Sequence, residues 1–402
     1  MFELKKCTRP FLLALACFSL LLGSVCAAEE TRAIIDSRGV EVQVPVDINR
    51  VVTISDGLVE SVMTLLDVQE KLVGLGSECL PKVWQFEYPS VKGGNFTYND
   101  GMNPVNYLNP WIRDLPLVCK SGTAVNYETL AGLDPDVVIL RLGDCTFQSP
   151  DDENAKKTIQ SIESMGIPLI VLYGPPCFDK PGKEVITEEM RILGQLFAGE
   201  EKTMEVAKYL ESIVDMVQER TRDIPEAEKP KVLMFGLSPN ARKDGGAGTA
   251  HGLTTIESNF IEEIANARNA YQENVGNFQV LSTEQVLALD PDVIVLCTAW
   301  GYHPPRELYE APYYQNLQEM KAIKNQRVMA LPWTPCNCAK RLEYPIDVMV
   351  IAKAAYPERF QDIELDQWLL EFYQKVYGVD EKTAKGIRIA QFMDWTVEEN
   401  SS

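Results

Sequence analysis

The sequence LDPDV at Leu133–Val137 occurs again at Leu289–Val293, and both copies stand in the same local context. The first lies within NYETLAGLDPDVVIL and the second within STEQVLALDPDVIVL. In each copy a polar residue and a glutamate begin a helix with an apolar face, and Asp-Pro ends it because the residue before proline avoids the α region. The β-branched runs that follow are typical of strands buried on both faces of a parallel sheet.

Each copy is therefore one helix-to-strand step of an α/β unit. DPDV is a common way to enter a strand, so chance repetition is the alternative. Duplication is favoured because the copies also share Glu128 with Glu284 and Leu133 with Leu289 at equal offsets. The sequence predicts an α/β protein of two similar lobes, each with a central, mainly parallel sheet flanked by helices.

The connection between the lobes is predicted to be helical. The stretch GEEKTMEVAKYLESIVDMVQERTRD has one apolar face, with acidic residues at its start and basic residues at its end, as the helix dipole favours. These patterns divide the chain into a lobe at 29–183, linking helices at 184–229, and a second lobe with a helical tail at 230–402. Residues 79–120 mix aromatic residues with Gly, Pro and Asn, and we expect an irregular insertion there.

Residues 1–28 are predicted to be a signal peptide. Basic residues precede the apolar run Phe11–Gly23, and small residues surround a cleavage point near Ala27 or Ala28. A lipid anchor at Cys26 is the alternative, although Val25 is larger than the residue that usually precedes such a cysteine. We expect a periplasmic protein without a cytoplasmic role.

The composition excludes several classes of function. A formal net charge of −20 argues against nucleic acid as a partner. The sequence contains no Gly-x-Ser-x-Gly, no His-Glu-x-x-His and no phosphate-binding Gly-Lys-Ser/Thr loop, so it predicts no enzyme and no cofactor. With two histidines, the chain gives little support to a site for a bare metal ion.

Ligands of open α/β sheets bind beyond the carboxyl ends of the strands, and polar or aromatic residues follow several predicted strands. Arginines there suit anionic groups, aromatics can pack on a flat chelate, and histidine can ligate a metal. Each has a plainer alternative: an ion-paired arginine, a core aromatic or a polar loop histidine. The candidate ligand-binding residues are Asp56, Trp84, Tyr88, Arg141, Tyr173, Arg242, His251, Trp300, Trp333 and Arg341.

Cys336 and Cys338 form a Cys-Asn-Cys sequence on a predicted strand-end loop. They could hold a soft metal, or one of them could form a disulfide with another cysteine of the mature chain. An odd number of cysteines follows Ala28, so at least one thiol is unpaired or used otherwise.

The order of these motifs resembles the substrate-binding proteins of ABC importers. An export signal, DSRGVEVQVPVDINRVVTIS, the two LDPDV segments with a helical link between them, and YPERF before a helical tail are similar to the helical-backbone class that carries iron-siderophores, haem or cobalamin. The resemblance implies a ligand cleft between lobes joined by a single long helix, little hinge motion, and a monomer that delivers a metal chelate to a membrane permease. It also implies that Glu128 and Glu284 dock on that permease.

Two other functions remain open for the same fold. The chain could be a sensory or surface-binding module, or it could bind a bare metal ion. The sequence alone does not name the ligand.

Overall fold

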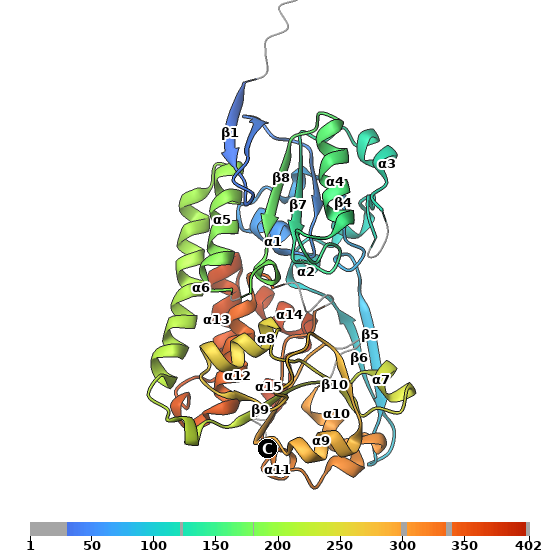
Figure 1. The fold of residues 1–402 in the computed structure, drawn as a ribbon, viewed down its shortest axis with the longest axis vertical. Helices are drawn as coiled ribbons and strands as arrows, with labels where there is room; N and C mark the ends of the chain where they lie inside the picture. Colours follow the sequence, from blue (N-terminus) through green and yellow to red (C-terminus); the bar gives the residue numbers. More distant parts are fainter. Residues whose placement is uncertain (1–29, 121–123, 180, 299–303, 335–339, 399–402) are drawn as a thin grey trace, which may run out of the picture.

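The computed structural model describes residues 30–120, 124–179, 181–298, 304–334 and 340–398. The predicted signal peptide, with Cys26, lies outside these ranges. Figure 1 shows two α/β lobes arranged along the long axis, with a pair of long helices running beside them. Within the described ranges, no helix combines the length and the apolar character that a bilayer crossing requires.

The first lobe is built on a four-stranded parallel sheet in the order β4-β3-β7-β8. A short antiparallel hairpin, β1 with β2, precedes this sheet, as the alternating sequence predicted. The strands are β1 (Thr31–Ile35), β2 (Glu41–Pro45), β3 (Val51–Ile54), β4 (Leu72–Leu75), β7 (Val137–Leu142) and β8 (Leu169–Tyr173). The helices of this lobe are α1 (Leu58–Leu65), α3 (Tyr127–Gly132) and α4 (Glu153–Ser164).

The second lobe has a mixed sheet in the order β12-β10-β9-β13-β14, with β11 also paired to β9. Strands β9, β13 and β14 are parallel, and β10 is antiparallel to β9. The strands are β9 (Lys231–Gly236), β10 (Gly248–Ala250), β11 (Arg268–Asn269), β12 (Gln279–Leu281), β13 (Val293–Leu296) and β14 (Val328–Ala330). The helices are α7 (Pro239–Lys243), α8 (Ile256–Asn259), α9 (Thr283–Leu289), α10 (Pro305–Glu310), α11 (Lys321–Lys324), α12 (Tyr344–Ala355), α13 (Leu365–Tyr377), α14 (Glu381–Ala390) and α15 (Trp395–Glu398).

The repeated Asp-Pro ends a helix in both lobes, as predicted. Asp134 follows α3 with φ of 44°, and Asp290 follows α9 with φ of 39°. This left-handed conformation stops helical hydrogen bonding and turns the chain toward the next strand. The two strands that follow, β7 and β13, lie in separate sheets, each at the centre of its own lobe.

The second aspartate of each copy attaches its strand to the start of the neighbouring parallel strand, β3 in the first lobe and β9 in the second. The Asp136 carboxylate accepts a hydrogen bond from the backbone N–H of Arg50 (2.8 Å), and the Asp292 carboxylate accepts one from the backbone N–H of Lys231 (2.8 Å). The backbone N–H of each aspartate in turn donates to the carbonyl of the same partner residue, at 2.9 Å in both lobes. The two copies therefore make equivalent hydrogen bonds in their two lobes, which supports the predicted duplication.

The sheet of the first lobe is buried on both faces. Val137 and Ile139 of β7 belong to a large core shared with the long helices, whereas Val138 and Leu140 belong to a smaller core on the opposite face. This explains why the first four residues of β7, Val137–Leu140, are all apolar.

Helices α5 (Glu184–Leu196) and α6 (Glu200–Thr221) connect the lobes. They lie side by side along one edge of the molecule (Figure 1). Helix α5 packs on α1, β1 and β8 of the first lobe, and α6 packs on α12 of the second. Twenty-two residues give α6 a length of about 33 Å. The connection is therefore a stiff element rather than a tether.

The segment 79–120 is ordered, and the prediction of an irregular insertion was wrong. Strands β5 (Trp84–Pro89) and β6 (Asn95–Gly101) form an antiparallel hairpin whose turn contains Gly93 and Gly94, both with positive φ. The aromatic residues of this segment alternate with polar ones, and this period of two places them on one face of the hairpin. After the hairpin come α2 (Pro104–Leu108) and a 3₁₀ turn (Pro110–Asp114).

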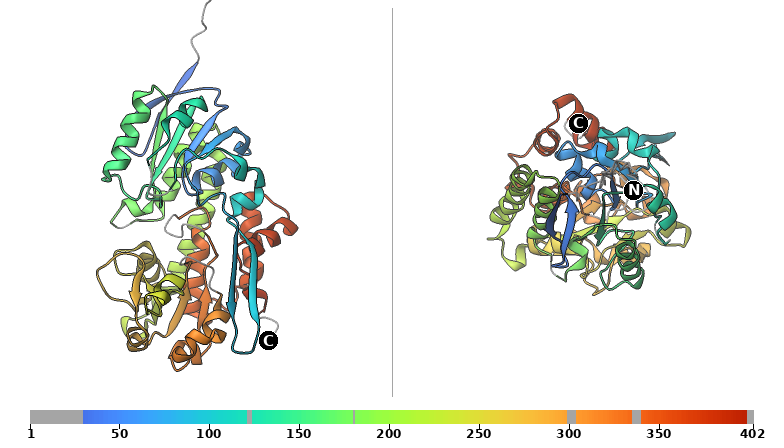
Figure 2. Two further views of the ribbon diagram at one scale, coloured as in Figure 1. Left: turned by 90° about the vertical axis from the view of Figure 1, so that its right-hand side faces the viewer. Right: turned by 90° about the horizontal axis from the view of Figure 1, so that it is seen from above.

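The hairpin leaves the first lobe and packs along the second, as the left view of Figure 2 shows. At its turn, the backbone N–H of Val91 donates to the carbonyl of Glu310 at 2.8 Å, and Lys92 Nζ lies 2.8 Å from the Glu310 carboxylate. Closer to its base, Trp84 packs on Trp333, with ring centroids 5.6 Å apart. The hairpin is therefore a second connection between the lobes.

Candidate ligand-binding cleft

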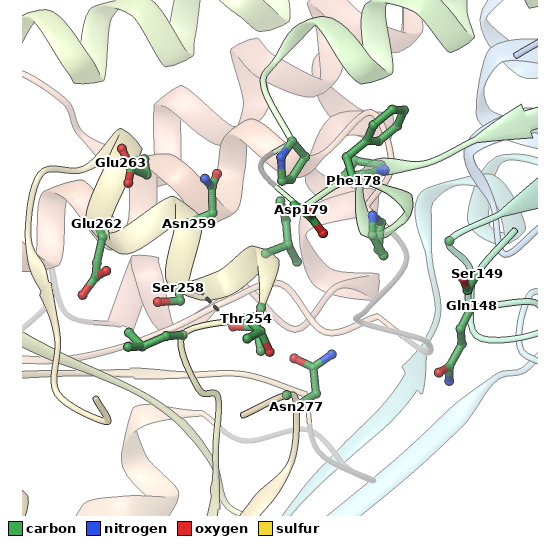
Figure 3. A pocket seen from close by; sticks show the side chains of 18 of the residues that line it. Gln148, Ser149, Phe178, Asp179, Thr254, Ser258, Asn259, Glu262, Glu263 and Asn277 are labelled. Carbon is green, nitrogen blue, oxygen red and sulfur yellow. Dashed lines mark hydrogen bonds between the residues drawn. The ribbon is translucent and has the colours of Figure 1, made fainter. Parts of the chain in front are cut away.

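A cleft of about 640 Å³ lies between the two lobes (Figure 3). Its first-lobe wall consists of the loops that follow β7 and β8, and its second-lobe wall consists of α8, the turn after it and the loop before β12. Both walls thus include chain that follows strands, where open α/β sheets bind their ligands. Residues that represent the two walls are Asp144, Gln148, Ser149, Phe178 and Asp179 on one side and Thr254, Asn259, Glu262, Asn277 and Phe278 on the other.

A glycine makes the tight turn at the end of β7 that opens the first-lobe wall. Gly143 has φ of 89°, and a Cβ there would lie 3.2 Å from both the Cys177 sulfur and the Gly174 carbonyl oxygen. Only glycine meets both requirements without strain. The turn brings Asp144 to the surface of the cleft.

The described cleft lining is acidic and polar. It contains the carboxylates of Asp179, Glu262 and Glu263, and no lysine, arginine or histidine among the residues that the structure describes. The Asp144 carboxylate is fully buried at the edge of the cleft, where it is paired with Arg141. Amide and hydroxyl groups lie between these carboxylates, together with the rings of Phe178 and Phe278. Such a surface favours a ligand whose outer groups are neutral or cationic, with hydrogen-bonding atoms and some apolar area.

Arg141 lies in the layer behind this wall. The sequence predicted that it would follow a strand, but β7 extends to Leu142 and Arg141 is a fully buried part of it. Its guanidinium contacts Asp144 and Glu189, each at 2.6 Å. These two ion pairs are the reason that an arginine can occupy the strand interior. They also hold the Asp144 side chain in place at the cleft.

Asp56 and Arg341 lie in the buried layer behind Asp144 and do not line the cleft. The backbone N–H of Asp56 donates to Asp144 at 2.7 Å, and the Asp56 carboxylate accepts from the backbone N–H of Cys145 at 2.7 Å. Arg341, which precedes α12 of the second lobe, donates from Nε to the backbone carbonyl of Asp56. Its Nη1 donates to Thr334 at 2.5 Å. Arg341 therefore ties the two lobes together behind the cleft.

His251 lies behind the second-lobe wall, where it is 1 % exposed. Its Nδ1 is 2.9 Å from Asn277 Oδ1 and 3.5 Å from a Glu257 carboxylate oxygen, and its Nε2 is 3.4 Å from the Cys297 sulfur. Burial by itself lowers the pKa of His251, but Cys297 and Glu257 raise it, and the result lies well above the ordinary value. These neighbours therefore favour the protonated form of the ring.

Lys340 completes this buried network. Its Nζ lies 3.1 Å from Glu257 and 3.0 Å from Asp347. Burial disfavours the charged form of Glu257, but Lys340 and His251 outweigh it and hold its pKa far below the usual range. Glu257 thus faces two cations, which stabilise its charge in the interior. Burial raises the pKa of Asp347, although Lys340 opposes that shift.

Several predicted residues lie away from the cleft. Trp333 is buried between Trp84 and Phe392, and Tyr88 is buried in the hairpin. Arg242 stacks over the ring of Tyr313, 4.1 Å from its centroid. These residues stabilise the contact between the hairpin and the second lobe or the interior of that lobe.

Tyr173 is half-buried at the end of β8 and is not part of the described cleft lining. Trp300, Cys336 and Cys338 lie outside the described residues. Of the other cysteines, Cys145 is disulfide-bonded. None of the predicted ligand-binding residues that the structure describes lines the cleft directly, but Asp56 and Arg141 contact Asp144, and His251 contacts Asn277.

The residues that do line the cleft were missed because the prediction stopped at the first polar residue after each strand. Asp144, Gln148 and Ser149 lie further along the same loop, beyond Gly143. The pair Gly143-Asp144, which follows the apolar run of β7, was the sequence feature that could have indicated this loop. Asn277 and Phe278 come from a loop before a three-residue strand, for which the sequence gives little pattern.

The two glutamates at equivalent motif positions are both exposed. Glu128 lies in the first turn of α3, and Glu284 lies in the first turn of α9. The pKa of Glu284 is lowered because backbone N–H groups at the start of α9, and then Ser282, donate to its carboxylate. One exposed carboxyl group is therefore available on each lobe.

Residues 103–334 match the model of the periplasmic binding protein family. This is more than half of the chain, and the chain belongs to that family. It is an extracytoplasmic solute-binding protein of the kind that serves ABC transporters, and the relatives named below are binding proteins rather than enzymes.

The molybdate-binding protein MolA of Haemophilus influenzae is 24 % identical over 396 residues, which cover 94 % of this chain and 99 % of MolA. The structure of MolA bound to molybdate superposes with a TM-score of 0.60 at 21 % identity, covering 87 % of this chain and 98 % of that one.

Two further solved structures share the fold. A periplasmic solute-binding protein of Veillonella parvula has a TM-score of 0.67 at 20 % identity, covering 91 % of this chain and 98 % of that one. The nickel–histidine complex of CeuE from Helicobacter pylori has a TM-score of 0.59 at 16 % identity, covering 89 % and 99 %. The two-lobe fold predicted from the sequence is confirmed.

The electrostatics behind the cleft predict an unusual dependence of stability on pH. Glu60 of α1 is fully buried, with no ion pair to a basic side chain in the described part of the chain. Burial raises its pKa from 4.5 to about 7. Between these values the folded state keeps a proton that the unfolded state releases, so the free energy of unfolding falls as the pH rises.

Glu60→Gln is therefore expected to raise the free energy of unfolding by about 3 kcal/mol at pH 8 and by much less at pH 5. Urea denaturation at the two pH values measures the difference. Glu228→Gln, at an exposed position, is the matched control and should change neither value. An equal effect of Glu60→Gln at both pH values would contradict the assignment of a protonated buried carboxyl.

Proposed function

We propose that this protein captures a metal chelate in the cleft between its lobes and delivers it to the permease of an ABC importer. The observation that carries the proposal is the cleft itself. Its volume of about 640 Å³ falls in the range of sites for small organic ligands and exceeds what a bare ion needs.

The donor groups also favour a metal that arrives with its own ligands. Within the described residues, no group of three or more His, Cys, Asp or Glu side chains is placed to hold a metal ion. The carboxylates on the cleft walls instead favour contact with a neutral or cationic outer surface. We therefore favour a neutral or cationic chelate, such as a trihydroxamate iron-siderophore or a cobalamin, over a strongly anionic one. Haem is kept as a further candidate among the metal chelates.

A tetrahedral oxyanion is the second candidate. It is favoured by the relation to MolA, whose name records molybdate binding and which aligns over nearly the whole chain. An oxyanion requires convergent N–H donors or positive charge. The basic residues Arg341, Lys340 and His251 lie behind the cleft in the second lobe, but none of them is part of the described cleft lining.

Isothermal titration of the mature protein separates these candidates. We expect ferrioxamine B or cyanocobalamin to bind with a dissociation constant of about 1 μM or below, as is ordinary for a specific small-molecule site. Triply anionic ferric enterobactin and sodium molybdate should bind more weakly. Haemin is included in the same series.

Molybdate binding in the absence of any chelate binding would overturn the chelate proposal in favour of the oxyanion. Binding of none of these ligands would contradict both. Preference for the anionic siderophore would contradict the argument from the acidic lining.

Glu128 and Glu284 are the proposed docking residues for the permease. Each is exposed at the same position of the repeated motif, and one lies on each lobe. Charge complementarity of this kind steers association and fixes orientation. A sensory or surface-binding module of the same fold would not deliver a ligand to a permease, so it would not need these two glutamates.

The double variant Glu128→Ala/Glu284→Ala should abolish ligand uptake by cells while leaving the affinity for the ligand unchanged. Uptake of labelled ligand and titration of the purified variant measure the two effects. The matched control is Glu153→Ala/Glu381→Ala, which removes exposed glutamates from the first turns of α4 and α14. Normal uptake by the first variant would exclude the docking role and favour the alternative module.

A further inference from the structure

The contacts of His251 determine how a neighbouring residue of the cleft is oriented. An imidazolium has two N–H donors and no acceptor. Its Nε2 faces Cys297, and its Nδ1 faces both Glu257 and the side-chain amide of Asn277 at 2.9 Å. The amide must therefore turn its carbonyl oxygen toward the ring, because its NH₂ group would meet another donor there.

The surrounding charges keep His251 in this state. Glu257 of α8 lies 3.5 Å from His251 Nδ1 and 3.1 Å from Lys340 Nζ, so it is the carboxylate that faces the ring. Asp347 faces Lys340 instead, and burial raises the pKa of Asp347 although Lys340 and Arg341 oppose that shift.

Asn277 itself faces the ligand space. It is exposed and belongs to the cleft lining. With Oδ1 committed to His251, its Nδ2 makes no hydrogen bond within the described residues. In Figure 3 the amide nitrogen of Asn277 lies on the side that faces Gln148 across the cleft.

We infer that Asn277 is a specificity-determining residue of the cleft, whose amide, oriented by protonated His251, presents an N–H donor to an oxygen acceptor of the ligand. The inference rests on the proposed function, since it concerns the same cleft, and it names the group that is recognised. Hydroxamate, carboxylate and amide carbonyl oxygens are acceptors of the required kind. His251 acts through Asn277 and is a positioning residue.

Titration of ferrioxamine B into variants at pH 7 tests the donor. Asn277→Ala removes it without changing charge and should weaken binding about 3- to 10-fold, the value of one hydrogen bond. Asn277→Asp replaces the donor by an acceptor. Gln148→Glu, on the opposite wall, adds a carboxylate without touching His251 and is the control for charge. We expect the Asn277→Asp variant to bind ferrioxamine B more weakly than the Gln148→Glu variant does.

The nitrogen-15 spectrum of His251 tests the orientation without any ligand. Both ring nitrogens should carry protons at pH 7, and loss of the signals in His251→Gln assigns them. A neutral ring, or unchanged affinity in Asn277→Ala, would overturn the inference. A wild-type protein that binds none of the chelates would instead contradict the proposed function, and the spectrum would then decide the state of His251 by itself.

Discussion

Two rigid connections fix the separation of the lobes, and the cleft depends on both. Helix α6 extends along the second lobe while its partner α5 packs on the first. On the other side of the molecule in Figure 1, the hairpin of β5 and β6 starts in the first lobe and is held at its turn by Glu310 of the second. Arg341 joins the lobes again behind the cleft. A site held in this way is largely preformed, so the protein loses little conformational entropy when the ligand binds.

The chemistry of the cleft is determined by two layers of residues. The inner layer carries Arg141 behind the first wall and His251 behind the second, both of which the sequence analysis selected, together with Lys340, which it did not. These groups are buried and paired, so they do not meet the ligand. They set the position of Asp144 and the orientation of Asn277, which do line the cleft. A buried network of satisfied charges is well suited to this role because it has one arrangement of lowest energy.

The fold could be predicted from the sequence because its strongest signals are local. In both lobes Asp-Pro-Asp ends a helix and starts a buried strand, and the sequence around it shows both features. The hydrogen bonds of the second aspartate to the neighbouring strand were seen only in the structure. The hairpin was missed because its alternating aromatic pattern is mixed with Gly, Pro and Asn, and because the surface that it covers comes from distant residues such as Trp333 and Phe392.

The cleft lining was harder to predict for a physical reason. A strand end is visible in the sequence to within a residue or two, but the direction of a side chain after a turn is not. Arg141 shows the consequence, since two further residues of strand place it in the interior instead of the cleft. Asn277 depends on a contact with His251, 26 positions away, which no local pattern records.

The fixed separation of the two lobes can be measured directly. Spin labels at Lys156 of α4 and Lys324 of α11, both exposed, report the distance between the lobes by pulsed electron paramagnetic resonance. The account predicts one narrow distance distribution that shifts by less than about 2 Å when the chelate that binds is added. A broad distribution in the free protein, or a clearly larger shift on binding, would show that the lobes move independently and would contradict it.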